Sequence, residues 1–333
     1  MEVSEQRRFT VEEFSAVGDV RRAGIDLSRN LGFGETDAGR VGIVATEAAT
    51  NLVKHAGGGE LLLRSLRAGG VSGIGILALD RGRGIPNVAA ALRDGFSQAG
   101  SPGTGLGAMR RLSTAFDVYS SPGVGTAVLS AIWPTPPGDG SMSIGGVNVP
   151  HPREEVSGDA WAVKVTRDWT AVLVADGLGH GPNAAQASAA ARAVFHQHAG
   201  LAPADLMARM HEALRPTRGA AVAVAQIDMT KRLVYFAGIG NIAATIHVDG
   251  ATRSLVSHHG TLGHDVRRIQ EFSYPWPAGA LLVLNSDGLV SNWLLDRYPG
   301  LAMRDSMLTA GVLYRDFRRG NDDASVVVIR EVA

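Results

Sequence analysis

The sequence contains no cysteine among its 333 residues. This absence excludes disulfide bonds, thiolate zinc sites and thiol nucleophiles, and it is compatible with a reducing compartment. A bound metal ion would therefore need carboxylate or histidine ligands. The sequence also has no run approaching the ~18 apolar residues of a membrane span, and its first residues, MEVSEQRRFTVEEF, lack the apolar segment of a signal peptide. We therefore expect a soluble, cytoplasmic protein with no membrane partner.

No sign of charge is in excess, because lysine plus arginine and aspartate plus glutamate each number 32. A formal net charge of zero gives no overall field that would attract nucleic acid or an acidic membrane surface. We therefore expect no nucleic-acid partner. The length of the chain exceeds what one hydrophobic core usually organises, so two domains are favoured.

The best domain boundary is a segment rich in proline, glycine and serine, WPTPPGDGSMSIGG at 133–146. It predicts a first domain at 1–133, a linker at 134–144 and a second domain at 145–333.

Hydrophobic periodicity differs between the two predicted domains. In the first, helical spacing near 17–31 and 41–52 precedes strand patterns between 60 and 132, which suggests an α/β sandwich with helices on one side. In the second, many short strand patterns surround helical segments near 182–199, 203–214 and 300–315. The expected fold class is α+β with two domains.

Three motifs of the first domain suit nucleotide chemistry. In VGIVATEAATNLVKHAGGG, Glu47 and Asn51 stand four residues apart and project together from the edge of a packed helix face. The amide oxygen can ligate magnesium and the carboxylate can accept a hydroxyl proton, although the pair alone also fits ordinary exposed polar residues. LALDRGRGIP then ends a strand on Asp80, and GSPGTGLGAMRRL leads a glycine loop into a helix whose N–H groups can hold phosphate.

The order of these motifs resembles that of the GHKL ATPases, with the Bergerat α/β sandwich fold. Over most of 15–133 the chain is most similar to the RsbT-like anti-sigma serine kinases of partner switching. The resemblance implies that Glu47 is the catalytic base, Asn51 the Mg²⁺ ligand and Asp80 the acceptor of the adenine amino group of ATP. It further implies a base pocket and a phosphate lid, formed respectively by Gly82 and Gly84 and by Gly103, Gly105 and Gly107.

Aspartates recur at predicted strand ends in the second domain. The motifs are SGDAW with Asp159, VADGLGHG with Asp176, NSDGLV with Asp287, and GNDDASVVVIR with Asp322 and Asp323. Each alone also fits an ordinary turn. Four separate motifs that each supply a carboxylate, in a sequence without cysteine, match what two hard divalent cations need. Such ions bind oxygen ligands whose negative charge neutralises them.

This half, over about 145–331, resembles the metal-dependent type 2C protein phosphatases, in the SpoIIE and RsbX branch, with an α-β-β-α sandwich. The resemblance implies two Mn²⁺ or Mg²⁺ ions, with Asp176 bridging both and the Gly177 carbonyl ligating one. Asp159, Asp287 and Asp322 complete the set, and Asp322 is preferred to Asp323 because it holds the first position of the closing motif. We find no counterpart of the arginine that holds phosphate in eukaryotic relatives.

Together the two resemblances imply a bifunctional regulator, an ATP-dependent protein serine kinase joined to a phosphoserine/phosphothreonine phosphatase. The implied partners are STAS-domain anti-sigma antagonists or stressosome-like proteins, with a sigma factor or downstream regulator as a further candidate. An alternative is a phosphatase whose first domain docks a partner under nucleotide control and transfers no phosphate. Glu47 argues against this alternative without excluding it.

Overall fold

The computed structural model describes residues 6–93, 105–138, 140–290 and 292–332. The chain divides into two units, one spanning Val3–Asp139 and the other Gly140–Ala333. Each unit is described by itself below.

The N-terminal unit is built on a five-stranded antiparallel sheet with the order β1-β2-β3-β5-β4. The strands are β1 (Gln6–Val11), β2 (Gly59–Ala68), β3 (Val71–Leu79), β4 (Ala115–Ser121) and β5 (Gly125–Ile132). The helices are α1 (Ser15–Asn30), α2 (Glu35–Asn51), α3 (Val88–Ala91) and α4 (Gly105–Leu112), and a π-helical turn, Leu52–Ala56, prolongs α2.

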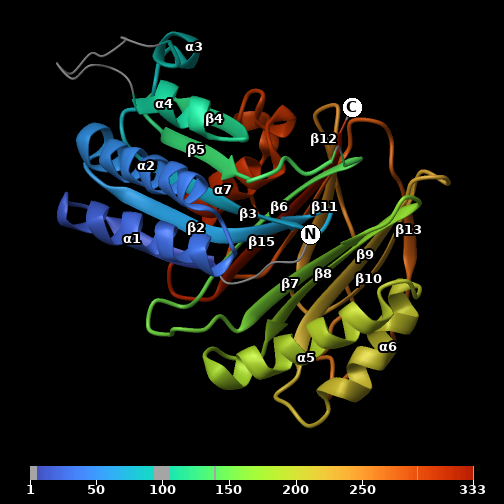
Figure 1. Ribbon diagram of the computed structural model, residues 1–333. Helices are drawn as coiled ribbons and strands as arrows, with labels where there is room; N and C mark the ends of the chain where they lie inside the picture. The colour runs from blue at the N-terminus through green and yellow to red at the C-terminus, as the bar shows by residue number, and fades with distance from the viewer. Residues whose placement is uncertain (1–5, 94–104, 139, 291, 333) are drawn as a thin grey trace. The chain divides into compact units, whose positions relative to one another are not determined.

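The core of this unit lies between the sheet and helices α1 and α2, which cover one face of it (Figure 1). Val41, Val44 and Ala48 lie on one side of α2 because they are spaced three and four residues apart. They pack with Leu61 and Leu63, which alternate along β2 and so share a sheet face. The predicted sandwich with helices on one side is confirmed.

The C-terminal unit contains two five-stranded sheets, with the orders β13-β10-β9-β8-β7 and β12-β11-β14-β15-β6. The first is formed by β7 (Asp159–Val165), β8 (Trp169–Gly177), β9 (Ala220–Asp228), β10 (Leu233–Ile239) and β13 (Phe272–Pro275). The second is formed by β6 (Met142–Val149), β11 (Ala243–Val248), β12 (Ala251–Ser254), β14 (Leu281–Asn285) and β15 (Ala324–Glu331).

Helices cover the outer faces of the two sheets. Helix α5 (Pro182–His198) packs mainly on β7 and β8, and α6 (Pro203–Leu214) packs on β9 and β10. Helix α7 (Ser306–Phe317) packs on β6 and β15 (Figure 1). The sheets meet where Trp161 of β7 lies over Gly146 of β6; a Cβ atom at Gly146 would come within 2.6 Å of the indole ring. This is the expected α-β-β-α arrangement.

The glycines of SMSIGG belong to a strand, although they helped to suggest a linker. Strand β6 begins at Met142, inside the segment expected to connect the domains. Gly145 lies against the backbone of Met307 at the start of α7, and Gly146 lies under Trp161. These glycines therefore serve close packing on both faces of the strand, which composition alone could not distinguish from flexibility.

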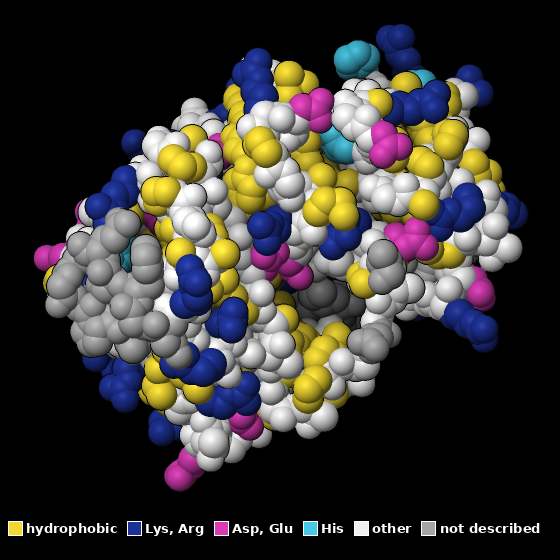
Figure 2. Space-filling model, turned by 90° about the horizontal axis from the view of Figure 1, so that it is seen from above, with side chains coloured by type: hydrophobic (Ala, Val, Ile, Leu, Met, Phe, Trp, Pro, Cys, Tyr) yellow, Lys and Arg dark blue, Asp and Glu magenta, His cyan; other side chains and the backbone are white. Residues whose placement is uncertain are grey.

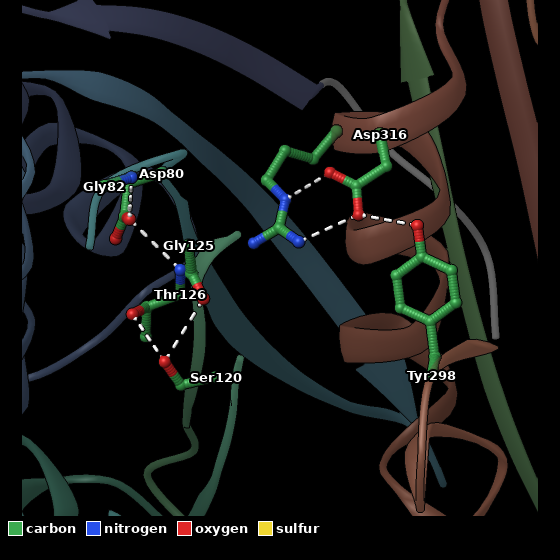
Figure 3. Close-up of polar contacts among 8 residues, drawn as sticks. Asp80, Gly82, Ser120, Gly125, Thr126, Tyr298 and Asp316 are labelled. Carbon is green, nitrogen blue, oxygen red and sulfur yellow. Dashed lines mark hydrogen bonds and ion pairs between the residues drawn. The ribbon is translucent and has the colours of Figure 1, made fainter. Parts of the chain in front are cut away.

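Helix α7 begins later than the helical pattern near 300–315 suggested. Two 3₁₀ turns, Leu295–Arg297 and Leu301–Met303, precede it, and Asp305 caps it by accepting a hydrogen bond from the Met307 N–H at 2.7 Å. Near its other end, Asp316 accepts hydrogen bonds from Arg315 at 2.7 and 2.9 Å and from the Tyr298 hydroxyl at 3.0 Å (Figure 3).

The described surface carries charges of both signs. On the face seen in Figure 2, lysine and arginine side chains are interspersed with hydrophobic, acidic and uncharged ones, in keeping with the formal net charge of zero. Among the described residues, no helix combines the length and apolar character needed to cross a bilayer.

Candidate active sites

Asp80 is held at the end of β3 by backbone donors. Its Oδ1 accepts hydrogen bonds from the Gly82 N–H at 2.8 Å and from the Thr126 N–H at 3.0 Å (Figure 3). The Thr126 hydroxyl lies 2.9 Å from the Ser120 hydroxyl. This framework fixes one carboxylate oxygen and so orients the other, which is what recognition of an amino group needs.

The glycines after Asp80 allow close backbone approach. A Cβ atom at Gly82 would lie 2.7 Å from the Cα atom of Ala56, the last residue of the π-helical turn. Gly84 has a φ of +69° and contacts the Ser121 carbonyl more closely than a side chain would allow. These contacts join the loop after β3 to the π-helical turn that prolongs α2 and to the end of β4.

Glu47, Asn51 and Gly105 come together although the third lies more than fifty residues further along the chain. A Cβ atom at Gly105 would lie 3.1 Å from Glu47 Oε2 and 3.3 Å from Asn51 Oδ1. Asn51 also donates a hydrogen bond to the sulfur of Met109 at 3.8 Å. The first turn of α4 therefore lies directly over the polar pair of α2. Gly107 is buried in the same helix, and Gly103 lies outside the described residues.

The aspartates of the C-terminal unit lie at one end of its two sheets. Asp159 begins β7 and is paired in register with Asp176, the last residue but one of β8. Asp287 follows β14, while Asp322 and Asp323 precede β15, the antiparallel neighbour of β14. Their mutual electrostatic effects show that the five carboxylates form one acidic cluster.

Burial and mutual repulsion oppose ionisation in this cluster. Burial and then the neighbouring Asp159 and Asp287 raise the pKa of Asp176 to about 9. Burial raises the pKa of Asp159 to about 7, against the stabilising hydrogen bond from Ser286. Burial and then Asp322 raise the pKa of Asp287. A cation between these groups would relieve the repulsion.

Neutral side chains donate hydrogen bonds to two of the aspartates, Asp159 and Asp287. The Ser286 hydroxyl donates to Asp159 Oδ2 at 2.6 Å and accepts from the Ser325 N–H at 3.0 Å. The Asn241 side chain donates to Asp287 Oδ2 at 2.6 Å, and the Asn148 side chain donates to the Asp159 carbonyl at 2.9 Å.

The two adjacent aspartates of the closing motif differ in their surroundings. Asp322 is partly exposed and its Oδ1 accepts the Asp323 N–H at 2.9 Å. Asp323 is buried, and its Oδ1 accepts the His151 N–H at 2.9 Å. Asp323 therefore fastens the loop before β7 to the start of β15, which leaves the more accessible Asp322 for a ligand.

The donor chemistry of the cluster fits divalent metal ions. Asp159 Oδ1 and Asp323 Oδ2 are buried without a hydrogen-bond partner, and buried carboxylates without partners are costly unless a cation or proton compensates them. Within the described residues, no three histidine, aspartate or glutamate side chains already surround a single metal position. Each ion would therefore need water or backbone oxygens beside the carboxylates, as magnesium commonly does. Gly177, whose backbone packs against the Ala184 carbonyl, could offer such an oxygen.

The chain matches two family models, one over each unit. Residues 11–133 match the histidine kinase-like ATPase domain, and residues 166–331 match stage II sporulation protein E (SpoIIE). Over 113 residues the chain is 34% identical to the serine/threonine-protein kinase RsbT of Bacillus subtilis (strain 168), which covers 34% of this chain and 85% of that protein. The chain belongs to the RsbT kinase family.

The C-terminal unit has relatives of its own. Over 137 residues the chain is 23% identical to the phosphoserine phosphatase RsbX of Bacillus subtilis (strain 168), covering 41% of this chain and 69% of that protein. A solved RsbX structure in complex with magnesium shares the fold at a TM-score of 0.53 and 18% identity, over 58% of this chain and 97% of that one. A chain from a structural study of the bacterial stressosome is 26% identical with a TM-score of 0.54, over 57% of this chain and 100% of that one.

These findings confirm the expected fusion of an RsbT-like kinase domain with a SpoIIE-type phosphatase domain. The chain carries a serine/threonine phosphatase domain and an RsbT-like kinase domain, which supports a role in partner-switching regulation.

Sequence reasoning missed the neutral residues that orient the acids. Ser286 lies between a strand and Asp287, where its hydroxyl looks like part of a turn, and Asn241 follows a glycine in an unremarkable GIGN loop. Thr126 is the second residue of β5, and nothing in its local sequence connects it with Asp80. The Gly-Thr pair at the start of β5 could have drawn attention to Thr126. The roles of Ser286 and Asn241 depend on which strand ends lie side by side, which the sequence does not give.

Proposed function

We propose that this chain both adds and removes phosphate in one partner-switching circuit, with STAS-domain proteins or stressosome-like scaffolds as its protein substrates. The N-terminal unit would phosphorylate serine with ATP, and the C-terminal unit would hydrolyse phosphoserine or phosphothreonine. The similarity to RsbT and to a stressosome chain supports this choice of partners.

One observation carries the kinase half of the proposal. The carboxylate of Glu47 lies beside Asn51 and close to Gly105: a Cβ atom added at Gly105 would be 3.1 Å from Glu47 Oε2. A domain that only docked a partner would have no need for a carboxylate at this point of the nucleotide site. We propose that Glu47 accepts the proton of the substrate serine as its oxygen is phosphorylated.

The remaining residues of the N-terminal site would hold the nucleotide. ATP, when bound with Mg²⁺, supplies the phosphoryl group. Asp80 would accept a hydrogen bond from the adenine amino group through its second oxygen, and Gly82 and Gly84 would form the base pocket. Asn51 would ligate Mg²⁺, and the N–H groups near Gly105 and Gly107 would hold phosphate.

In the C-terminal site, we propose that carboxylates and one carbonyl hold two Mn²⁺ or Mg²⁺ ions. The proposed donors are Asp159, Asp176, the Gly177 carbonyl, Asp287 and Asp322. When bound, the ions supply positive charge and an activated water for attack on the phosphoryl group. Ser286 keeps Asp159 in place and Asn241 keeps Asp287 in place through the hydrogen bonds described above.

The proposal is tested by incubating the purified chain with labelled ATP and candidate STAS-domain proteins, with and without manganese. We expect label on a serine of one of these proteins, and faster loss of that label when manganese is present. Binding of ATP without transfer to any of the proteins would instead favour the docking alternative for the N-terminal unit.

A further inference from the structure

The segment after α7 is paired with the turn that carries Asp287. The Arg319 N–H donates to the Gly288 carbonyl at 2.8 Å, and the Val290 N–H donates to the Phe317 carbonyl at 2.9 Å. Leu289 and Arg318 form an antiparallel bridge between the same segments. Gly288 also lies directly against the Asp323 carbonyl. The backbone of Arg319 is thus fixed at the acidic cluster.

The charge of Arg319 acts on one carboxylate of this cluster, that of Asp287. Burial and Asp322 raise the pKa of Asp287, whereas the Arg319 guanidinium lowers it. Arg319 is exposed, and its side chain has no hydrogen bond or ion pair with another described residue. A guanidinium beside the cluster but not bonded to any carboxylate keeps its donors available for an anionic ligand.

A second arginine stands beside the other Asp-Gly turn and provides a comparison. Arg218 precedes Gly219, whose carbonyl accepts the Leu178 N–H at 3.0 Å, and its Nη1 would lie 3.1 Å from a Cβ atom at Gly179. It is also exposed. Its guanidinium lies by Gly179, whereas the backbone of Arg319 is hydrogen-bonded to Gly288, the residue after Asp287. Because its backbone is bonded at the turn that carries Asp287, Arg319 is the candidate, and Arg218 is the comparison.

We propose that Arg319 binds the phosphoryl oxygens of the phosphoprotein substrate, the task for which the sequence offered no obvious arginine. The planar guanidinium can donate two parallel hydrogen bonds to a phosphate monoester, a geometry that lysine lacks. The inference rests on the phosphatase activity of the C-terminal unit. It assigns to that activity a substrate-binding residue that lies three residues before Asp322 and is joined by its backbone to the turn that carries Asp287.

The test compares Arg319→Gln with Arg319→Lys, Arg218→Gln and Arg209→Gln in the full chain with manganese. Arg209 lies on the exposed side of α6, so its substitution is a control for the loss of one positive charge. Hydrolysis of a phosphoserine peptide gives KM, kcat and the manganese concentration for half activation. Calorimetry with inorganic phosphate gives a binding constant that does not depend on turnover.

For Arg319→Gln we expect the KM and the phosphate Kd to rise about tenfold or more, as for loss of a charge-assisted hydrogen bond. We expect the manganese requirement to stay unchanged and Arg319→Lys to fall between this variant and the wild type. Arg218→Gln and Arg209→Gln should resemble the wild type.

Two results would overturn the inference. One is an unchanged phosphate Kd in Arg319→Gln, or a change confined to the manganese requirement, which would mean that Arg319 only offsets the acidic charge. The other is a larger loss of phosphate affinity in Arg218→Gln. If the wild type binds phosphate without hydrolysing the peptide, the phosphatase proposal fails while calorimetry still decides the role of Arg319.

Discussion

Asp159 and Asp176 face each other across the antiparallel pair of β7 and β8, with raised pKa values of about 7 and about 9. Two carboxylates on paired strands, both largely removed from water, resist simultaneous ionisation. The protein therefore maintains an electrostatically unfavourable cluster where divalent ions are proposed to bind. This relationship makes the metal site testable through stability as well as through activity.

Replacing Asp176 by Asn should change how the stability of the metal-free protein depends on pH. An aspartate whose pKa is raised in the folded state binds more protons there than in the unfolded chain, so the free energy of unfolding falls as pH rises from about 4 towards 9. Asp176→Asn should flatten this slope and, at pH 8 without metal, should be more stable than the wild type by at least ~1 kcal/mol. Denaturant unfolding at several pH values measures the difference.

The same variant should lose manganese-dependent hydrolysis. Manganese should stabilise the wild type at pH 8 and leave Asp176→Asn nearly unaffected, because binding to the folded state alone adds to stability. Equal stabilisation of both proteins by manganese would show that Asp176 is not a ligand.

Ser286→Ala should weaken the metal site without removing a carboxylate. The substitution takes the donor from Asp159 and the acceptor from the Ser325 N–H, both of them buried. We expect a loss of about 1–3 kcal/mol in stability and a higher manganese concentration for half activation. Ser254→Ala on the exposed strand β12 is the matched control. A manganese requirement equal to that of the wild type would show that Ser286 has no part in holding the metal site.

Asp80→Asn should weaken binding of adenine nucleotide. Asn keeps one acceptor for the Gly82 and Thr126 N–H groups but has only one carbonyl oxygen, so the adenine amino group loses its proposed acceptor. Calorimetry with ATP and Mg²⁺ should show an affinity at least about tenfold lower, while manganese-dependent phosphatase activity stays unchanged. Undiminished ATP affinity would contradict the assignment of Asp80.

Gly105→Ala should impair phosphate transfer by crowding Glu47 and Asn51. The added methyl group would lie 3.1 and 3.3 Å from their side-chain oxygens, closer than ordinary contacts. Gly39→Ala on α2 is the control, because nothing lies within 4 Å of its new methyl group and alanine favours the helix. We expect Gly39→Ala to transfer phosphate normally and Gly105→Ala to transfer it at a rate reduced about tenfold or more. Equal rates would mean that α4 does not form part of the active site.

Long periodic segments and strand-end acids could be predicted from the sequence because local pattern determines them. Helix α2 and the Glu47–Asn51 pair follow directly from helical spacing, and Asp176 follows from a buried strand that ends in Asp-Gly. Strand β1 was not predicted, because QRRFTV on the sheet edge has two adjacent arginines and little alternation.

The orienting contacts could not be predicted because they cross between strands. Ser286 reaches Asp159 only because the ends of β14 and β7 meet, and Arg319 reaches the Asp287 turn only through backbone pairing after α7. Glycine was ambiguous for a similar reason: Gly145 and Gly146 mark close packing of β6 against α7 and Trp161, whereas their composition suggested a linker.

The central claim is that one chain both adds phosphate to a partner and removes it from the same partner. A time course of partner phosphorylation at fixed ATP and manganese tests this claim most directly. The wild type is compared with Asp287→Asn and with the double variant Glu47→Ala, Asp287→Asn. We predict that steady-state phosphorylation of the partner rises in Asp287→Asn, because hydrolysis stops, and vanishes in the double variant, because transfer stops as well. Unchanged steady-state phosphorylation of every tested partner in Asp287→Asn would contradict the claim and would mean that the two units act on separate targets.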